Sequence, residues 1–162
     1  MAIVYLGLGS NMRPEHNLEM AVNNLRSRFG DIVLSSVYQS KALGFDGDDF
    51  LNLVAQIETE LQPVEVVEVL EEIHDLSGRE RGCAKFVARP LDIDLLLYDR
   101  LIDQSPPVRV PRSDVLEYSF VLVPLAEIAA DYVHPQTGHN ISDHLAEFDE
   151  SAHPLTKVAL AL

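Results

Sequence analysis

The most informative run in the chain is Arg89-Pro90-Leu91-Asp92-Ile93-Asp94-Leu95-Leu96-Leu97-Tyr98. Its apolar residues predict a β-strand over 91–98, in which positions two apart face the same side. Asp92 and Asp94 would therefore point to one place, while Leu91, Ile93 and Leu95 face the core. Two like charges held this close repel each other, and burying either one unpaired costs several kcal/mol or more. The run therefore predicts a strand that needs a bound cation.

The segments before this run alternate between strand and helix patterns. Apolar runs predict strands at 3–8, 32–40 and 50–59, with a loop at 43–49. Apolar residues at helical spacing predict one helix from about Pro14 to Phe29, ended by Gly30, and a second helix from Pro63 to Leu76. With the strand at 91–98, the order is β-α-β-β-α-β. This order predicts an α+β fold of the ferredoxin-like type, in which two helices cover one face of an antiparallel sheet.

The residues after about Asp99 predict C-terminal additions to this fold. They contain proline-rich loops, an apolar run at 120–123, a helical turn at 124–130, and a polar tail with a short helix near 142–148. The total length of 162 residues is that of one domain, so we expect a single domain over 1–162.

Composition excludes several classes of partner. The formal net charge of −14 argues against nucleic acid, which binds mainly through Lys and Arg. No apolar run approaches the roughly 18 residues of a membrane span, and the first residues lack the features of a signal peptide. The single cysteine, Cys83, excludes an internal disulfide. We therefore expect a cytoplasmic protein that binds small molecules and neither nucleic acid nor membrane. We also expect a monomer, although composition does not bear on the oligomeric state.

Four of the twelve basic residues precede the aspartates within eleven positions: Arg79, Arg81, Lys85 and Arg89. A basic cluster in an acidic protein indicates a small polyanion such as the phosphate chain of a nucleotide, although a solvated loop has the same composition. Mg²⁺ is commonly held by one or two carboxylates, waters and substrate phosphates. The cluster and the aspartate pair together favour metal-assisted phosphoryl transfer. The chain has no Walker loop, so the arginines and the metal would have to hold the nucleotide.

Several motifs occur in the order found in one enzyme family. They are Gly9-Ser10-Asn11, Phe50-Leu51-Asn52, Gly78-Arg79-x-Arg81, Arg89-x-Leu91-Asp92-x-Asp94-Leu95, Val110-Pro111, Phe120-x-Leu122-x-Pro124-Leu125-x-Glu127-Ile128-Ala129 and His134-Pro135. In this order the chain resembles the 6-hydroxymethyl-7,8-dihydropterin pyrophosphokinases over almost its whole length.

The resemblance implies an ATP-dependent diphosphotransferase of folate biosynthesis. Such an enzyme transfers pyrophosphate from ATP to the hydroxymethyl group of 6-hydroxymethyl-7,8-dihydropterin and releases AMP. By the family pattern, Asp92 and Asp94 would bind two Mg²⁺ ions. Arg79 and Arg89 would hold the transferred phosphates as catalytic residues, with Arg81 nearby on the nucleotide.

The resemblance also implies a pterin pocket. The pterin would stack against Phe50 and Phe120, and Phe86 stands where the family usually has a tryptophan. Asn52 would read the amide edge of the pterin together with backbone groups around Ser40 to Leu43. An asparagine suits this task because its side chain offers both a donor and an acceptor.

Other family positions have changed on the nucleotide side. Arg112 stands in place of a usual histidine and is a candidate phosphate contact. Val87-Ala88 replaces Gly-Pro, His74 replaces a glutamate, and Tyr118 replaces an arginine. The six histidines show no compact metal-ligand spacing, and we expect most of them on the surface or in loops. Two alternatives stay open: a diverged paralogue that binds pterin or nucleotide without transfer, and a pyrophosphokinase with another acceptor alcohol.

Overall fold

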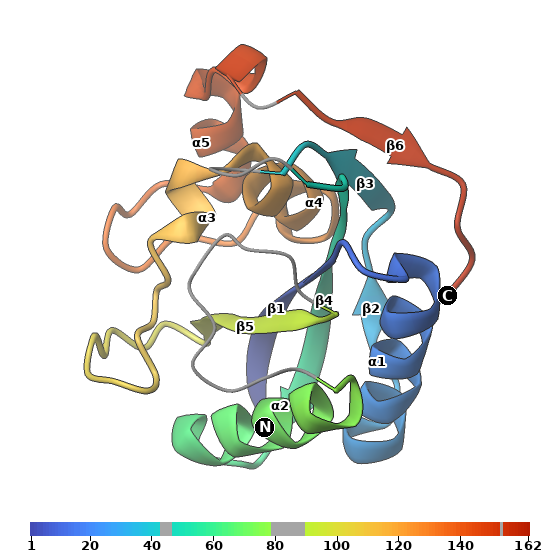
Figure 1. Cartoon of the computed structure of the whole chain (residues 1–162). Coiled ribbons are helices and arrows are strands. Elements are labelled where there is room, and N and C mark those ends of the chain that lie inside the picture. The colour runs from blue at the N-terminus through green and yellow to red at the C-terminus, as the bar shows by residue number, and fades with distance from the viewer. Residues whose placement is uncertain (43–46, 79–89, 153) are drawn as a thin grey trace.

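The computed structural model describes residues 1–42, 47–78, 90–152 and 154–162. Its strands are β1 (Ala2–Ser10), β2 (Val33–Leu34), β3 (Val37–Ser40), β4 (Phe50–Thr59), β5 (Asp92–Tyr98) and β6 (Thr156–Val158). Its helices are α1 (Pro14–Phe29), α2 (Pro63–Leu76), α3 (Asp114–Glu117), α4 (Ser119–Ala129) and α5 (Ile141–Glu147), followed by the 3₁₀ turn η1 (Glu150–Ala152) (Figure 1). Within these ranges, no helix is both long enough and apolar enough to cross a membrane.

The strands form an antiparallel sheet in the order β5-β1-β4-β3-β6, and β2 also pairs with β4. Counting β2 and β3 as one interrupted strand, β1 lies between the last and third strands of the β-α-β-β-α-β unit. This is the strand order of the ferredoxin-like fold, which confirms the predicted fold class. It places β5, the strand of the two aspartates, at one edge of the sheet.

Helices α1 and α2 pack on one face of the sheet, as the apolar spacing predicted. Their inward residues, among them Leu18 and Leu25 of α1 and Leu70 and Ile73 of α2, join buried strand residues in the larger core. Both helices begin with proline, whose missing N–H is no loss in a first turn. Gly30 ends α1 with a φ of 77°, a backbone conformation that favours glycine.

The predicted strand over 32–40 is two strands, because serine side chains interrupt the backbone ladder. The Val54 N–H donates to Ser35 Oγ (2.9 Å) in place of a backbone carbonyl. The next residue, Ser36, donates its N–H and its hydroxyl to the Glu127 carboxylate on α4, at 2.7 and 3.0 Å. Tyr38 OH donates to the same carboxylate at 2.7 Å. Glu127 thus fastens α4 to the sheet at the point where the strand breaks.

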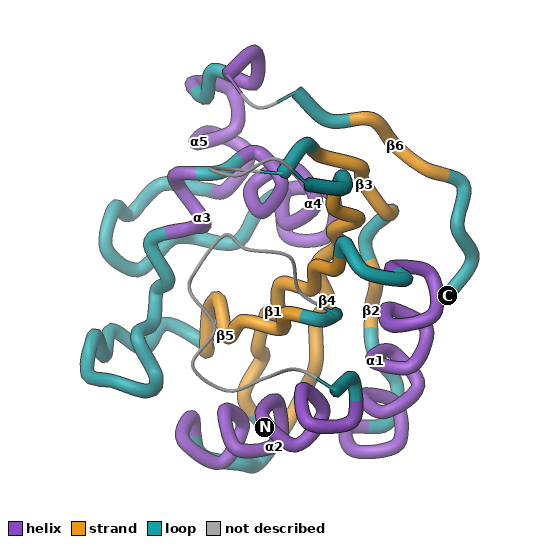
Figure 2. The backbone as a smooth tube through the Cα atoms, viewed as in Figure 1, coloured by secondary structure: helices purple, strands orange, loops and turns teal. Residues whose placement is uncertain are grey.

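The opposite face of the sheet is covered by α3, α4 and α5, which form a second core (Figure 2). The prediction of a helical turn at 124–130 was wrong about the start of α4, which begins at Ser119 and contains Pro124. Pro124 lacks the N–H that would bond the Phe120 carbonyl. Burial of Val121, Leu122 and Leu125 outweighs this lost hydrogen bond. The short helix expected near 142–148 is confirmed as α5.

The C-terminal tail adds a strand that the sequence analysis did not predict. β6 pairs with β3 through Val37 and Val158, and the chain then runs back toward α1, where Arg26 donates to the Leu162 carbonyl at 3.2 Å (Figure 1). The tail contains polar residues because β6 lies at the edge of the sheet, where Thr156 and Lys157 are exposed.

We expect Leu122→Ala to lower the free energy of unfolding by about 3 kcal/mol, since Leu122 is fully buried in the second core. The matched control is Leu76→Ala at the exposed end of α2, where the side chain is 63% exposed. That change should cost less than about 1 kcal/mol. Urea denaturation of both variants measures the difference, and equal losses would contradict the second core.

Candidate active site

Asp92 and Asp94 lie on β5, as the sequence predicted. Asp92 pairs with Gly9 and Asp94 pairs with Gly7 of β1, and both aspartates line a cavity of about 400 Å³. Leu91, Ile93 and Leu95 belong to the core under α1 and α2, so the predicted alternation is confirmed. Because β5 is an edge strand, the carboxylates are open to residues beyond the sheet.

A β-bulge interrupts the alternation immediately after the aspartates. The register moves from Leu6↔Leu95 to Tyr5↔Leu97, which leaves Leu96 as an extra residue on β5. Leu96 and Leu97 consequently both belong to the second core. The Leu96 carbonyl accepts the Arg112 N–H at 2.9 Å. The bulge therefore fixes the segment that carries Arg112 beside the carboxylate pair.

The Asp94 carboxyl is electrostatically disfavoured as an anion. Burial, reinforced by the negative charge of Asp92, raises the pKa of Asp94 to about 7, whereas Arg112 opposes this rise. Asp114 and a hydrogen bond between Asp92 and Asp94 add to the rise. A proton or a cation near the two carboxylates relieves this repulsion.

The donor set fits Mg²⁺. Carboxylate oxygens are the ligands that Mg²⁺ prefers, and the ion usually keeps waters and substrate phosphates in its remaining positions. Within the described ranges, no group of three or more His, Cys, Asp or Glu side chains is arranged to hold a metal. The aspartate pair therefore suits an ion that shares its coordination with a substrate.

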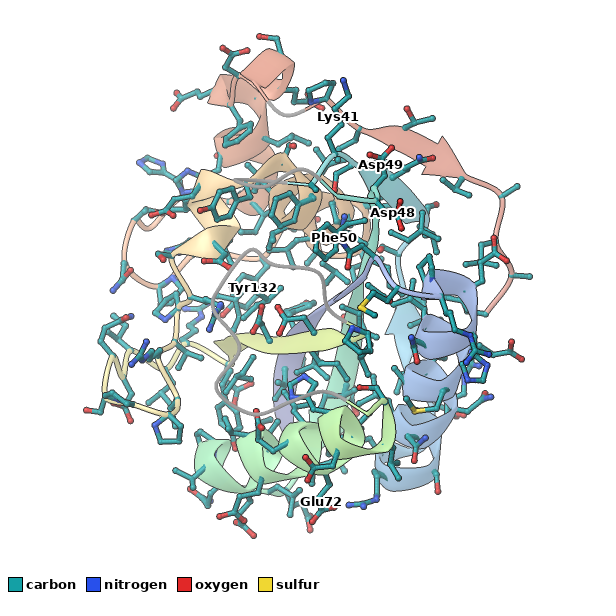
Figure 3. All side chains as sticks on the ribbon, viewed as in Figure 1. Lys41, Asp48, Asp49, Phe50, Glu72 and Tyr132 are labelled. Carbon is teal, nitrogen blue, oxygen red and sulfur yellow. The ribbon has the colours of Figure 1, made fainter. Side chains whose placement is uncertain are left out.

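The predicted pterin-binding residues that the structure describes lie in the same cavity. Phe50 and Asn52 come from β4, and Phe120 comes from α4. Figure 3 shows Phe50 at the end of the sheet that also carries Lys41, another residue of the cavity wall. Phe120 stacks on Tyr118, with ring centroids 5.0 Å apart and an interplanar angle of 12°.

The side chain of Asn52 is held in one place by its neighbours. Asn52 is buried and donates from Nδ2 to Ser40 Oγ at 2.8 Å. On its other side lies Gly9, where an added Cβ would come within 2.9 Å of Asn52 Oδ1. Glycine is required at position 9 because the amide of Asn52 occupies the space of a side chain.

The remaining predicted site residues lie outside the described residues. They are Leu43, Arg79, Arg81, Phe86 and Arg89, together with the altered Val87-Ala88 pair. Arg112, predicted as a nucleotide contact, is described and lines the cavity.

His74 was missed as a site residue, and it is an exception to the surface or loop placement expected for most of the histidines. Its side chain is buried in α2, where Nε2 accepts the N–H of Ile93 at 2.8 Å and Nδ1 lies 3.2 Å from Glu71 Oε1. An accepting Nε2 places the ring proton on Nδ1. His74 thus ties α2 to β5 between the two aspartates. Its position four residues after Leu70, on the apolar side of the helix, was the available signal. His134 is also buried.

Comparison with protein-family models matches residues 5–130 to 7,8-dihydro-6-hydroxymethylpterin-pyrophosphokinase, abbreviated HPPK. Among curated relatives, the chain is 39% identical to the 2-amino-4-hydroxy-6-hydroxymethyldihydropteridine pyrophosphokinase of Haemophilus influenzae, over 85% of this chain and 88% of the relative. It is 35% identical to the enzyme of the same name from Porphyromonas gingivalis, over 84% of this chain and 96% of the relative.

Solved structures support the same fold. An HPPK-DHPS protein in complex with substrates superposes with a TM-score of 0.73 at 12% identity, over 93% of this chain and 44% of that chain. Plasmodium falciparum HPPK-DHPS with pterin and p-hydroxybenzoate gives 0.71 at 13% identity, over 90% and 43%. The chain thus spans less than half the length of these structures.

We expect Asp94→Asn to raise the melting temperature of the metal-free protein by several degrees at pH 8, and by clearly less at pH 5. The Asp94 pKa is about 7 in the folded protein, against an ordinary value of 3.8 for an aspartate. Between these values the folded state binds more protons than the unfolded state, so wild-type stability falls as the pH rises from about 4 to about 7. Asparagine cannot ionise and escapes this loss.

Thermal melts in EDTA at both pH values measure the effect. The control Asp131→Asn changes an exposed carboxyl, and its effect should be small and similar at both pH values. A gain for Asp94→Asn that is equal at pH 5 and pH 8 would show that the carboxyl does not titrate in this range.

Proposed function

The chain belongs to the 7,8-dihydro-6-hydroxymethylpterin-pyrophosphokinase family and is a pyrophosphokinase of folate biosynthesis, and we propose that the Asp92–Asp94 cavity is its active site. There the pyrophosphoryl group of ATP would pass to the hydroxymethyl oxygen of 6-hydroxymethyl-7,8-dihydropterin, with release of AMP. One observation carries the assignment: the carboxylate pair and the Asn52 amide with its flanking aromatic rings line the same cavity. Phosphate chemistry and heterocycle recognition can therefore occur within reach of each other.

Asp92 and Asp94 are the proposed ligands of two Mg²⁺ ions. When bound, Mg²⁺ would neutralise phosphate charge and orient the ATP oxygens for in-line displacement. The two side chains contribute fixed oxygens because β5 holds them two residues apart on one face. The raised pKa of Asp94 supports this role, since a divalent cation relieves the repulsion that causes it.

The phosphate side of the site would be basic. Following the family pattern, we assign Arg79, Arg81 and Arg89 to the phosphates, with Arg79 and Arg89 contacting the transferred group. Within the cavity itself, Arg112 presents a guanidinium group. Arginine suits phosphate because its planar fork donates two parallel hydrogen bonds.

The pterin side of the site would be formed by Asn52, Phe50 and Phe120. Ser40 and Gly9 hold the Asn52 amide still, so that its oxygen and nitrogen face a heterocycle in a fixed order. A polar site of this kind rejects analogues that leave its groups unpaired. Leu43 and Phe86 complete the pterin contacts that we propose from the family pattern.

We also propose that residues 1–162 act as one catalytic domain and as a cytoplasmic monomer. The cavity supports a single catalytic domain, because its walls come from elements spread along the chain from Gly7 to Val121. Sedimentation of the active protein tests the monomer.

The activity is tested by separating AMP from ADP after incubation with ATP, Mg²⁺ and the hydroxymethyl pterin. Wild-type protein should form AMP only when the pterin is present. Asp94→Asn should reduce turnover by at least about a hundredfold, because it removes charge stabilisation in the transition state. Pterin binding without AMP would favour a non-catalytic paralogue, and AMP formation only with another alcohol would favour a different acceptor.

Gly9→Ala should raise the KM for the pterin by about tenfold and leave the KM for ATP unchanged, because its methyl group would displace the Asn52 amide. The double variant with Asn52→Ala provides the control. If Gly9→Ala acts through Asn52, it should cause little further loss in the Asn52→Ala background. Additive losses in the double variant would show that Gly9 matters for another reason.

A further inference from the structure

Arg112 lies between two carboxylates at the wall of the cavity. Its Nη2 atom is 3.5 Å from Asp94 Oδ1, and its Nε atom is 3.3 Å from Asp114 Oδ2. Its backbone N–H is bonded to the Leu96 carbonyl of the bulge. The backbone of Arg112 is thus held by β5, and its guanidinium group is held by the side chain of Asp114.

The two ion pairs of Arg112 differ in character. Asp114 is buried at the start of α3 and also makes a hydrogen bond to Arg112 through Nε, which directs the rest of the fork. The contact with Asp94 is longer than an ordinary hydrogen bond and is therefore mainly electrostatic. A contact of this kind can be lost without leaving a buried donor unsatisfied.

We propose that Arg112 is the resident counter-cation of the carboxylate pair in the nucleotide-free enzyme, and that it competes with Mg²⁺ for Asp94. This inference rests on the proposed metal site. The guanidinium group keeps its positive charge at all relevant pH values, so it stabilises the Asp94 anion while repelling a divalent ion at the same carboxylate. Arg112 is a positioning residue in this state.

The consequence is a link between metal and nucleotide. When the phosphate chain of a nucleotide enters, its negative charge offers the guanidinium a second partner, and the repulsion toward the metal is offset. Asp114 keeps the side chain of Arg112 at the cavity both with and without nucleotide. Arg112 should therefore oppose metal binding in the absence of nucleotide and no longer oppose it when nucleotide is bound.

The test measures binding of Mn²⁺, as a spectroscopic substitute for Mg²⁺, by electron paramagnetic resonance. At pH 8.5, where protons compete less for the Asp94 carboxylate, nucleotide-free Arg112→Gln should bind Mn²⁺ about tenfold more tightly than wild type, because a neighbouring unit charge shifts a carboxylate equilibrium by at least about this factor. With a non-hydrolysable ATP analogue, the same variant should bind Mn²⁺ no more tightly than wild type. Arg112→Lys keeps the charge and should stay close to wild type in both states.

Two control variants distinguish an effect of Arg112 on the metal from a general effect of losing an ion pair, and test the metal site itself. Arg28→Gln removes another arginine–carboxylate pair, to Glu72 on the outer side of α2 (Figure 3), and should leave Mn²⁺ binding unchanged. Asp94→Asn should abolish the binding.

Equal Mn²⁺ affinity of nucleotide-free wild type and Arg112→Gln would overturn the role of Arg112 and leave the proposed function intact. Mn²⁺ binding that Asp94→Asn does not reduce, with or without nucleotide, would overturn the metal site itself. Should Arg112→Gln fail to fold, Arg112→Met removes the same charge while keeping most of the length of the side chain, and it must tighten nucleotide-free Mn²⁺ binding for the inference to stand.

Discussion

The site depends on one constraint, which is the repulsion between two carboxylates on the same edge strand. Asp92 and Asp94 face the same cavity because a β-strand alternates its side chains. Their charge has to be balanced by groups from outside the strand. Arg112 provides that balance from the segment after β5, and the raised pKa of Asp94 shows that the balance is incomplete. The site is therefore ready for a further cation.

Much of the fold could be predicted from periodicity, because each long element buries one face. The spacing of Leu18, Leu25, Leu70 and Ile73 predicts α1 and α2, and the alternation around Ile93 predicts β5. The misses are places where a long-range contact overrides a local pattern. Side chains break the strand at 32–40 through contacts with β4 and α4, and burial of α4 overcomes Pro124. These long-range contacts cannot be recognised from the residues next to the break or next to Pro124.

The candidate site follows the same division. The aspartate pair and Asn52 are visible in the sequence because polar residues among apolar neighbours need a partner or a ligand. The residues that support the pair and Asn52 cannot be recognised in the sequence, because they contact the site from other helices and strands. His74 reaches β5 from α2, and Ser40 reaches Asn52 from β3. The first group could be proposed from the sequence, whereas only the three-dimensional structure shows the second.

The bulge at Leu96 ties the length of β5 to the chemistry beside it. Without Leu96, Leu95 and Leu97 would still face opposite sides and would still pair with Leu6 and Tyr5. The sheet could thus lose this residue and keep its pattern. The carbonyl that anchors Arg112 would disappear with it. Deletion of Leu96 would remove a buried side chain from the second core. Even if the strands kept their pairing, it would also misplace the charge on which the carboxylates depend.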